Sequence, residues 1–106
     1  MLRVYVAGPY SADKLINGLS NIGRGIFMAI KVLKMNFAVF VPWLDCLLAI
    51  MGFKDDIDVE LLRAHSMAWL KVSQAVLLVP GWQKSNGTLK EIEYAENHGI
   101  PVFERL

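Results

Sequence analysis

The sequence predicts a doubly wound α/β domain, in which a parallel sheet carries helices on both faces. Apolar segments of strand length alternate with segments of helical periodicity along the 106 residues. The run at 37–41 is apolar without interruption, which is typical of a parallel strand covered on both faces. A chain of this length is expected to form one domain, residues 1–106.

The first half of the chain reads as strand, helix and strand. Residues 2–7 alternate, are rich in β-formers and stop at Gly8-Pro9, which predicts a strand and a tight turn. A helix follows, Asn36 ends it, and 37–41 is the second strand. The apolar positions at helical spacing in that helix are Leu15, Leu19, Ile22, Ile26, Ile30 and Leu33.

The second half repeats this alternation. Residues 44–51 predict a short helix, and Asp58 or a neighbour is expected to cap a longer one in which Trp69 faces the core. The last helix is closed by Gly99, with Pro101 just beyond it. The remaining predicted segments are a strand at 75–79, a loop at 80–87, that last helix from Thr88 to about His98, and a short strand at 102–103.

The predicted topology selects two loops. Ligands of open parallel sheets bind beyond the carboxyl ends of the strands, where adjacent crossovers leave to opposite sides. With the strand order 2-1-3-4, that crevice lies between the first and third strands. The loops that face it are 8–11 and 80–87, which are the richest in glycine and proline.

The amino-acid composition limits the kinds of binding partner that we expect. Apolar residues make up 55% of the chain, so either most helices are buried on more than one side or apolar surface meets another subunit. We expect a homodimer or higher homo-oligomer. A formal charge of +1 without a basic block argues against a nucleic acid or a membrane as partner. A single Cys46 excludes an intramolecular disulfide, no residue spacing predicts a metal site, and without a signal peptide or membrane span we expect a cytoplasmic protein.

Glu91 has two interpretations. Thr88-Leu89-Lys90-Glu91 fits a capping box, with Thr88 as the N-cap and Glu91 returning to its backbone N–H. Alternatively, Glu91 shares a helix face with Thr88 and Ala95 that starts at the predicted crevice. A carboxylate there, beneath a glycine-containing loop, can act as a nucleophile or a base.

Other candidates also lie at strand ends. Gly8 and Pro9 permit a close approach of ligand to backbone, and Tyr10 and Ser11 add hydroxyls, although a plain strand-to-helix turn explains them equally well. Trp43 and Trp82 follow strand ends, where each is suited either to stack on a flat ligand or to pack at a subunit interface. His65 can be a general acid, but a lone histidine on an apolar helix is more often structural.

These residues resemble a known family. Tyr5-Val6-Ala7-Gly8-Pro9-Tyr10-Ser11, Leu78-Val79-Pro80-Gly81-Trp82, the spaced Ser85, Gly87, Glu91 and Ala95, and Gly99-Ile100-Pro101-Val102 are together similar to the nucleoside 2-deoxyribosyltransferase superfamily. The likeness is to its short bacterial and phage members, which are related to 2′-deoxynucleoside 5′-phosphate N-hydrolase. It spans nearly the whole chain, and the serine-glycine-glutamate motif is its sharpest part.

The resemblance implies a flavodoxin-like three-layer α/β/α sandwich. It implies an enzyme that cleaves or transfers at the N-glycosidic bond of a 2′-deoxynucleoside or its 5′-monophosphate. Glu91 would be the nucleophile and Tyr5 would orient it, with no metal or redox cofactor. The loops would hold the sugar and any phosphate through Gly8, Pro9, Tyr10, Ser11, Ser85 and Gly87, and the base would meet Trp43 and Asp45.

One departure bears on activity. The family usually carries an aspartate on the helix before the third strand to assist the leaving base, and Ser66 stands there in this chain. Ser73 and Gln74 occupy the place of a second aspartate. Either Asp45, Asp58 or His65 protonates the base, or the chain is weakly active or inactive. The alternative functions are therefore a catalytically degenerate nucleotide-binding module and, third, a plain interaction domain.

Overall fold

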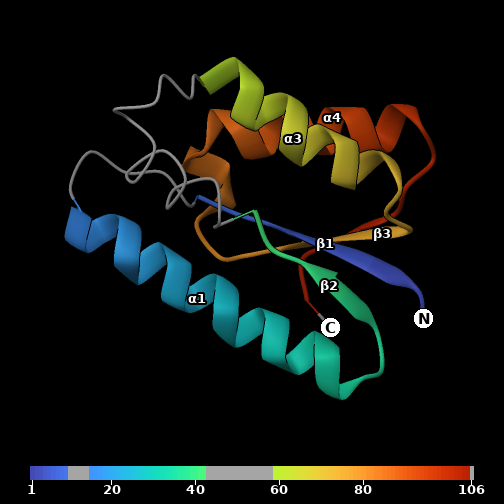
Figure 1. The fold of residues 1–106 in the computed structure, drawn as a ribbon, viewed down its shortest axis with the longest axis horizontal. Helices are drawn as coiled ribbons and strands as arrows, with labels where there is room; N and C mark the ends of the chain where they lie inside the picture. The colour runs from blue at the N-terminus through green and yellow to red at the C-terminus, as the bar shows by residue number, and fades with distance from the viewer. Residues whose placement is uncertain (10–14, 43–58, 106) are drawn as a thin grey trace.

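A computed structural model describes residues 1–9, 15–42 and 59–105 (Figure 1). Within them, four parallel strands form one sheet in the order β2-β1-β3-β4, which confirms the predicted order. β1 lies at the centre, where Val4 is in register with Val39 on one side and Ala75 on the other. The strands are β1 (Arg3–Ala7), β2 (Ala38–Phe40), β3 (Ala75–Leu78) and β4 (Val102–Phe103).

The helices form a layer on each face of the sheet. α1 (Leu15–Lys34) covers one face, and α3 (Val59–Lys71) and α4 (Asn86–Asn97) cover the other (Figure 1). A short 3-10 helix, η2 (Trp82–Lys84), joins β3 to α4. The fold is thus the three-layer α/β/α sandwich of flavodoxin-like type. The expected helix at 44–51 and its neighbour Asp58 lie outside the described residues.

The core has two sides because successive residues of β1 point to opposite faces. Val4 and Val6 pack on the α1 side, whereas Tyr5 and Ala7 pack on the side of α3 and α4. All four are buried, as expected for a central strand covered on both faces. Their main buried partners are Val32, Leu77 and Val79 on the α1 side, and Leu70, Val76, Leu78 and Ala95 on the other.

Two helices end as the sequence predicts. Asn36 and Gly99 follow α1 and α4 with positive φ angles of 66° and 70°. In each case the next residue donates its backbone N–H back into the last turn, from Phe37 to Val32 at 3.3 Å and from Ile100 to Ala95 at 2.9 Å. These bonds satisfy terminal carbonyls in the Schellman pattern. Asparagine and glycine are the residues that adopt this backbone conformation at least cost.

Side-chain burial departs from expectation at two places. Trp69, expected in the core, is 47% exposed, because its ring stacks on Phe40 at 5.2 Å with one side while the rest faces solvent. In α1, Ile22, Gly25 and Val32 are buried, but Leu19, Ile26, Ile30 and Leu33 are exposed. Among the described helices, none has the length and apolar character needed to cross a membrane.

Candidate functional site

The loops after β1 and β3 lie side by side at the carboxyl edge of the sheet. A Cβ built on Gly81 would lie 3.6 Å from Cγ of Pro9. Gly8 is buried and Pro9 is half-buried. Gly81 has a φ of 95°, a conformation that an L-residue rarely adopts, so glycine is required at this bend. The predicted pairing of these two loops is therefore confirmed for the residues that the structure describes.

The helix that carries Glu91 begins earlier than predicted. Ser85 is the N-cap of α4, and its Oγ accepts hydrogen bonds from the Thr88 backbone N–H at 3.2 Å and the Thr88 hydroxyl at 3.0 Å. A capping-box glutamate must stand three residues after the N-cap, and that position is Thr88. The interpretation of Thr88 as N-cap and Glu91 as its capping partner is wrong. The serine-to-threonine spacing at 85 and 88 was the signal for the true cap.

Glu91 instead lies in the second turn of α4, on the face that meets the sheet. Its Oε2 atom is buried, although the residue as a whole is only half-buried. Thr88 and Ala95, three positions before and four after it, share its face and are buried. Ala95 belongs to the core cluster that contains Tyr5. One oxygen of the carboxylate is thus shielded from water, on the helix face that leads from the loop edge to the core.

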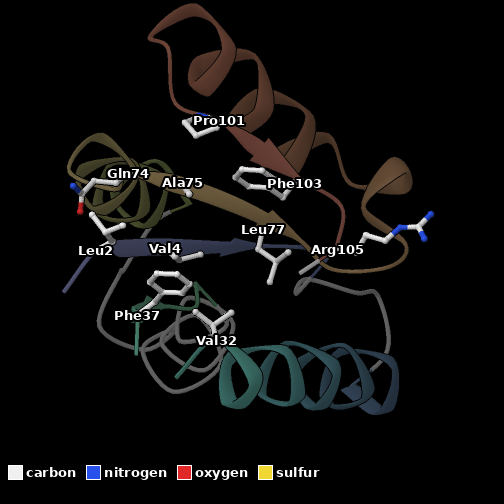
Figure 2. Close-up of a pocket in the computed structure, with 10 residues that line it drawn as sticks. All are labelled: Leu2, Val4, Val32, Phe37, Gln74, Ala75, Leu77, Pro101, Phe103 and Arg105. Carbon is white, nitrogen blue, oxygen red and sulfur yellow. The ribbon is translucent and has the colours of Figure 1, made fainter. Parts of the chain in front are cut away.

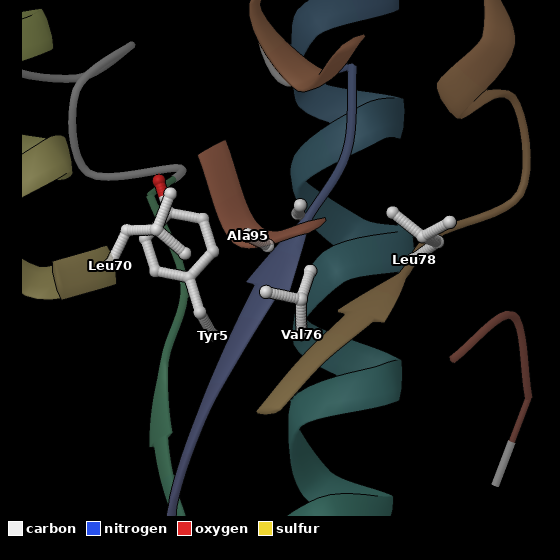
Figure 3. Packing of buried hydrophobic residues seen from close by; sticks show 6 residues of the cluster. Tyr5, Leu70, Val76, Leu78 and Ala95 are labelled. Atoms are coloured by element: carbon white, nitrogen blue, oxygen red, sulfur yellow. The ribbon is translucent and has the colours of Figure 1, made fainter. Parts of the chain in front are cut away.

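Tyr5 reaches the same side of the sheet from β1. Its side chain is fully buried, and its hydroxyl oxygen is buried as well. Figure 3 shows its ring beside Leu70 of α3, with Ala95 of α4 close by. On the strand side the ring centroid lies 5.5 Å from that of Phe40. The two residues proposed from sequence as nucleophile and orienter therefore lie in one layer, between the sheet and α4.

Phe40 is the centre of an aromatic array that the sequence did not single out. Besides Tyr5 and Trp69, it contacts His65 of α3 at a centroid distance of 6.2 Å. The Nδ1 atom of His65 is buried. Ser66, the next residue, is also buried and stands where the resemblance to the deoxyribosyltransferase superfamily implies an aspartate. Of the three groups considered as a replacement acid, His65 is the one within the described residues.

Ser73 and Gln74, which stand where the resemblance implies a second aspartate, form structural hydrogen bonds. Ser73 donates its hydroxyl to the Trp69 carbonyl at 2.9 Å, at the end of α3. The Gln74 side-chain oxygen accepts the Arg3 backbone N–H at 2.9 Å, and the Gln74 N–H donates to the Arg3 carbonyl at 2.8 Å. The Ser73 side chain therefore binds the end of α3, and Gln74 fixes the amino end of β1, at the edge opposite the candidate site.

Some of the predicted ligand-binding residues lie within the described part of the chain and others do not. Trp82 is half-buried and packs against the Tyr5 cluster, so part of its ring belongs to the core. A Cβ on Gly87 would meet Ser85 Oγ at 3.9 Å, an ordinary contact. The other four, Tyr10, Ser11, Trp43 and Asp45, lie outside the described residues. Across the described part of the chain, no group of three or more His, Cys, Asp or Glu could hold a metal ion.

A pocket of about 380 Å³ lies elsewhere, on the α1 side of the sheet (Figure 2). Its walls include Val4, Val32, Leu77 and Phe103, and its polar side chains are Gln74 and Arg105. No carboxylate lines it. This pocket is unsuited to the chemistry proposed for Glu91, which lies on the opposite face.

Comparison with known proteins identifies a family but no activity for it. No curated protein matches the chain. A family model described as a domain of unknown function, DUF1937, matches residues 2–105. Since this match covers almost all of the sequence, the chain belongs to the DUF1937 family.

Proposed function

We propose that this protein cleaves or transfers at the N-glycosidic bond of a 2′-deoxynucleoside or its 5′-monophosphate, with Glu91 as the nucleophile. The supporting observation is the location of that carboxylate. It lies on the core-facing side of α4 with Oε2 buried, one turn from the Tyr5 cluster, and helix capping does not account for it. The substrate class comes from the resemblance of the strand-end motifs to the deoxyribosyltransferase superfamily.

The proposed reaction has two displacements. A Glu91 carboxylate oxygen attacks the anomeric carbon, the bond to the base breaks, and a glycosyl ester forms. Water or a second base then attacks the same carbon and releases Glu91. The transition states carry oxocarbenium character, as in retaining glycosidases. A carboxylate oxygen that is shielded from water interacts strongly with such developing positive charge.

Tyr5 is the proposed positioning residue for Glu91. Packing on Phe40 and within the core cluster fixes its ring. A phenol held this way can direct its hydroxyl to a carboxylate without a large loss of rotamer entropy. The sugar would enter from the loops, past Gly8, Pro9, Ser85 and Gly87. The N-terminus of α4 offers backbone N–H groups and a favourable dipole to any 5′-phosphate.

The leaving base must also receive a proton. Ser66 cannot supply it, because a serine hydroxyl is not acidic at neutral pH. His65, adjacent in sequence and packed against Phe40, is the proposed donor within the described residues. Asp45 and Asp58 remain the alternative donors.

Chromatographic detection of free base tests the proposal. The protein is incubated with a panel of 2′-deoxynucleosides and their 5′-monophosphates, with and without a second base as acceptor. We expect base release or exchange that is lost in Glu91→Gln and retained in Glu93→Gln, an exposed glutamate on the same helix. Activity that survives Glu91→Gln would refute Glu91 as the nucleophile.

Ser66 favours a second candidate, a nucleotide-binding module without catalysis. A buried serine where the deoxyribosyltransferase superfamily has an acid is what loss of the leaving-group acid would produce. This function predicts that nucleotides raise the melting temperature while no base is released. A plain interaction domain predicts neither effect, and Glu91→Gln would then leave both assays unchanged.

A further inference from the structure

α1 carries a second apolar stripe on the side away from the sheet contacts. Leu19, Ile26, Ile30 and Leu33 are each between 40% and 53% exposed. The helix already buries Ile22, Gly25 and Val32, and Met28 packs against both clusters on that face of the sheet. The stripe is therefore additional to the face that anchors α1, and a monomer leaves it in contact with water.

The spacing of this stripe is that of a helix–helix seam. With Gly23 included, its positions are 19, 23, 26, 30 and 33, at alternating intervals of four and three residues. Such a 3.5-residue period packs knobs into holes against another helix. A Cβ on Gly23 would meet nothing within 4 Å, so the stripe has an open notch among large side chains. A notch beside knobs of isoleucine and leucine is self-complementary in shape.

The charges of α1 favour an antiparallel arrangement if it packs against a second copy of itself. Residues 15–34 include Arg24, Lys31 and Lys34 and no acidic residue. A parallel pair of α1 helices would place both lysines beside their own copies and align the two helix dipoles. In an antiparallel pair, the lysines lie across from residues 15–23 of the partner helix, which carry no charge, and the dipoles oppose each other. Gly23 then faces the large side chains in the second half of the partner helix.

We propose that a second copy of the chain covers this stripe, with the two α1 helices antiparallel about a twofold axis near Ile26. Leu19 then lies toward Leu33 of the partner subunit, and the contact is isologous, as in most soluble dimers. Four half-exposed side chains make an interface smaller than the roughly 800 Å² per partner of standard complexes. We therefore expect a dimer that dissociates on dilution. This interface does not depend on the proposed catalysis.

Sedimentation velocity across a wide dilution series tests the dimer. We expect Ile26→Lys to weaken it by about tenfold or more. Lysine is preferred to glutamate because the charged residues of α1 are all basic, so an added lysine is repelled by the partner helix whereas a glutamate would be attracted to it. The matched control is Leu89→Lys on α4, where the leucine is 43% exposed and Ile26 is 40%; it should leave dimerisation unchanged.

Cross-linking tests the orientation. Leu19 and Leu33 are 14 positions apart, so about 21 Å separates the two copies of residue 33 in an antiparallel pair centred near Ile26. In a Cys46→Ser background, a short bismaleimide should join an equimolar mixture of Leu19→Cys and Leu33→Cys proteins, but not Leu33→Cys alone. Cross-linking of Leu33→Cys alone would overturn the antiparallel arrangement.

Two results would overturn the dimer itself. One is a wild-type mass that remains monomeric at every concentration. The other is an Ile26→Lys protein that melts at a lower temperature with no change in mass, which would show that the protein's own chain covers the stripe. Dissociation that is equal in Ile26→Lys and Leu89→Lys would place the interface elsewhere and also reject the proposal.

Discussion

Replacing Ser85 by alanine removes two hydrogen bonds at the start of α4. Loss of a serine N-cap costs about 1 kcal/mol of stability. Thr88 is only 1% exposed, so its hydroxyl, which donates to Ser85 Oγ at 3.0 Å, would lose its acceptor in a dry environment. Such a group costs about 1–3 kcal/mol more. We expect Ser85→Ala to lower the free energy of unfolding by about 2–4 kcal/mol.

The partner variant Thr88→Val separates these two contributions. Valine keeps the shape of threonine and leaves the backbone N–H bond to Ser85 intact, so it should cost about 1 kcal/mol. The double variant should be more stable than the sum of the single losses predicts, by about 1 kcal/mol or more, because no hydroxyl is then left buried. Urea unfolding followed by far-ultraviolet circular dichroism gives each value, provided that the m-value is unchanged. A greater loss from Thr88→Val than from Ser85→Ala would refute the assignment of Ser85 as the cap.

Further substitutions test the core and the loops. Leu70→Ala should lower the free energy of unfolding by about 3–5 kcal/mol because Leu70 is fully buried. Leu61→Ala, on the same helix, should cost less than about 1 kcal/mol because Leu61 is 61% exposed. Equal urea midpoints for the two variants would contradict the burial of this face of α3. Gly81→Ala should destabilise by about 1–2 kcal/mol because of its positive φ. Gly87→Ala, in the first turn of α4, should be neutral or stabilising by up to about 1 kcal/mol and, under the proposed function, should raise KM for nucleotides. Thermal unfolding measures the stability of both glycine variants, and base-release kinetics measure KM for Gly87→Ala. A Gly81→Ala protein more stable than the wild type would contradict the strained backbone at residue 81.

The strands and helix ends could be predicted because their signals are local. Asn36 and Gly99 adopt a backbone conformation that few other residues accept, and each was identified as a helix end from sequence alone. The run at 75–78 and the alternation at 3–7 specify strands through side-chain type. The strand order 2-1-3-4 was taken from the known orders of doubly wound sheets, and the structure confirms it. Each of these inferences needs only short stretches of chain and a general rule of topology.

The start of α4 and the burial of α1 could not be obtained in this way. Ser85 and Thr88 are both acceptable N-caps, three residues apart, and the deep burial of Thr88 against the sheet decides between them. In α1, apolar residues occupy two faces of one helix, and periodicity alone does not say which face meets the sheet. The candidate site is likewise a tertiary property, because Tyr5 of β1 and Ala95, one turn after Glu91 on α4, join one core cluster through packing of elements far apart in sequence.

The central position of β1 has a consequence for how the protein is made. β1 occupies residues 3–7, yet its partner β3 begins at residue 75, and the bond from Arg3 to Gln74 spans 71 residues. A newly synthesised chain therefore holds its central strand without a complete sheet until about three quarters of the sequence has left the ribosome. Contacts of such long range slow folding, and exposed strands of this kind favour aggregation in the interval. Translation rate and chaperone supply should consequently affect the yield of this protein more than they affect a helical bundle of equal length.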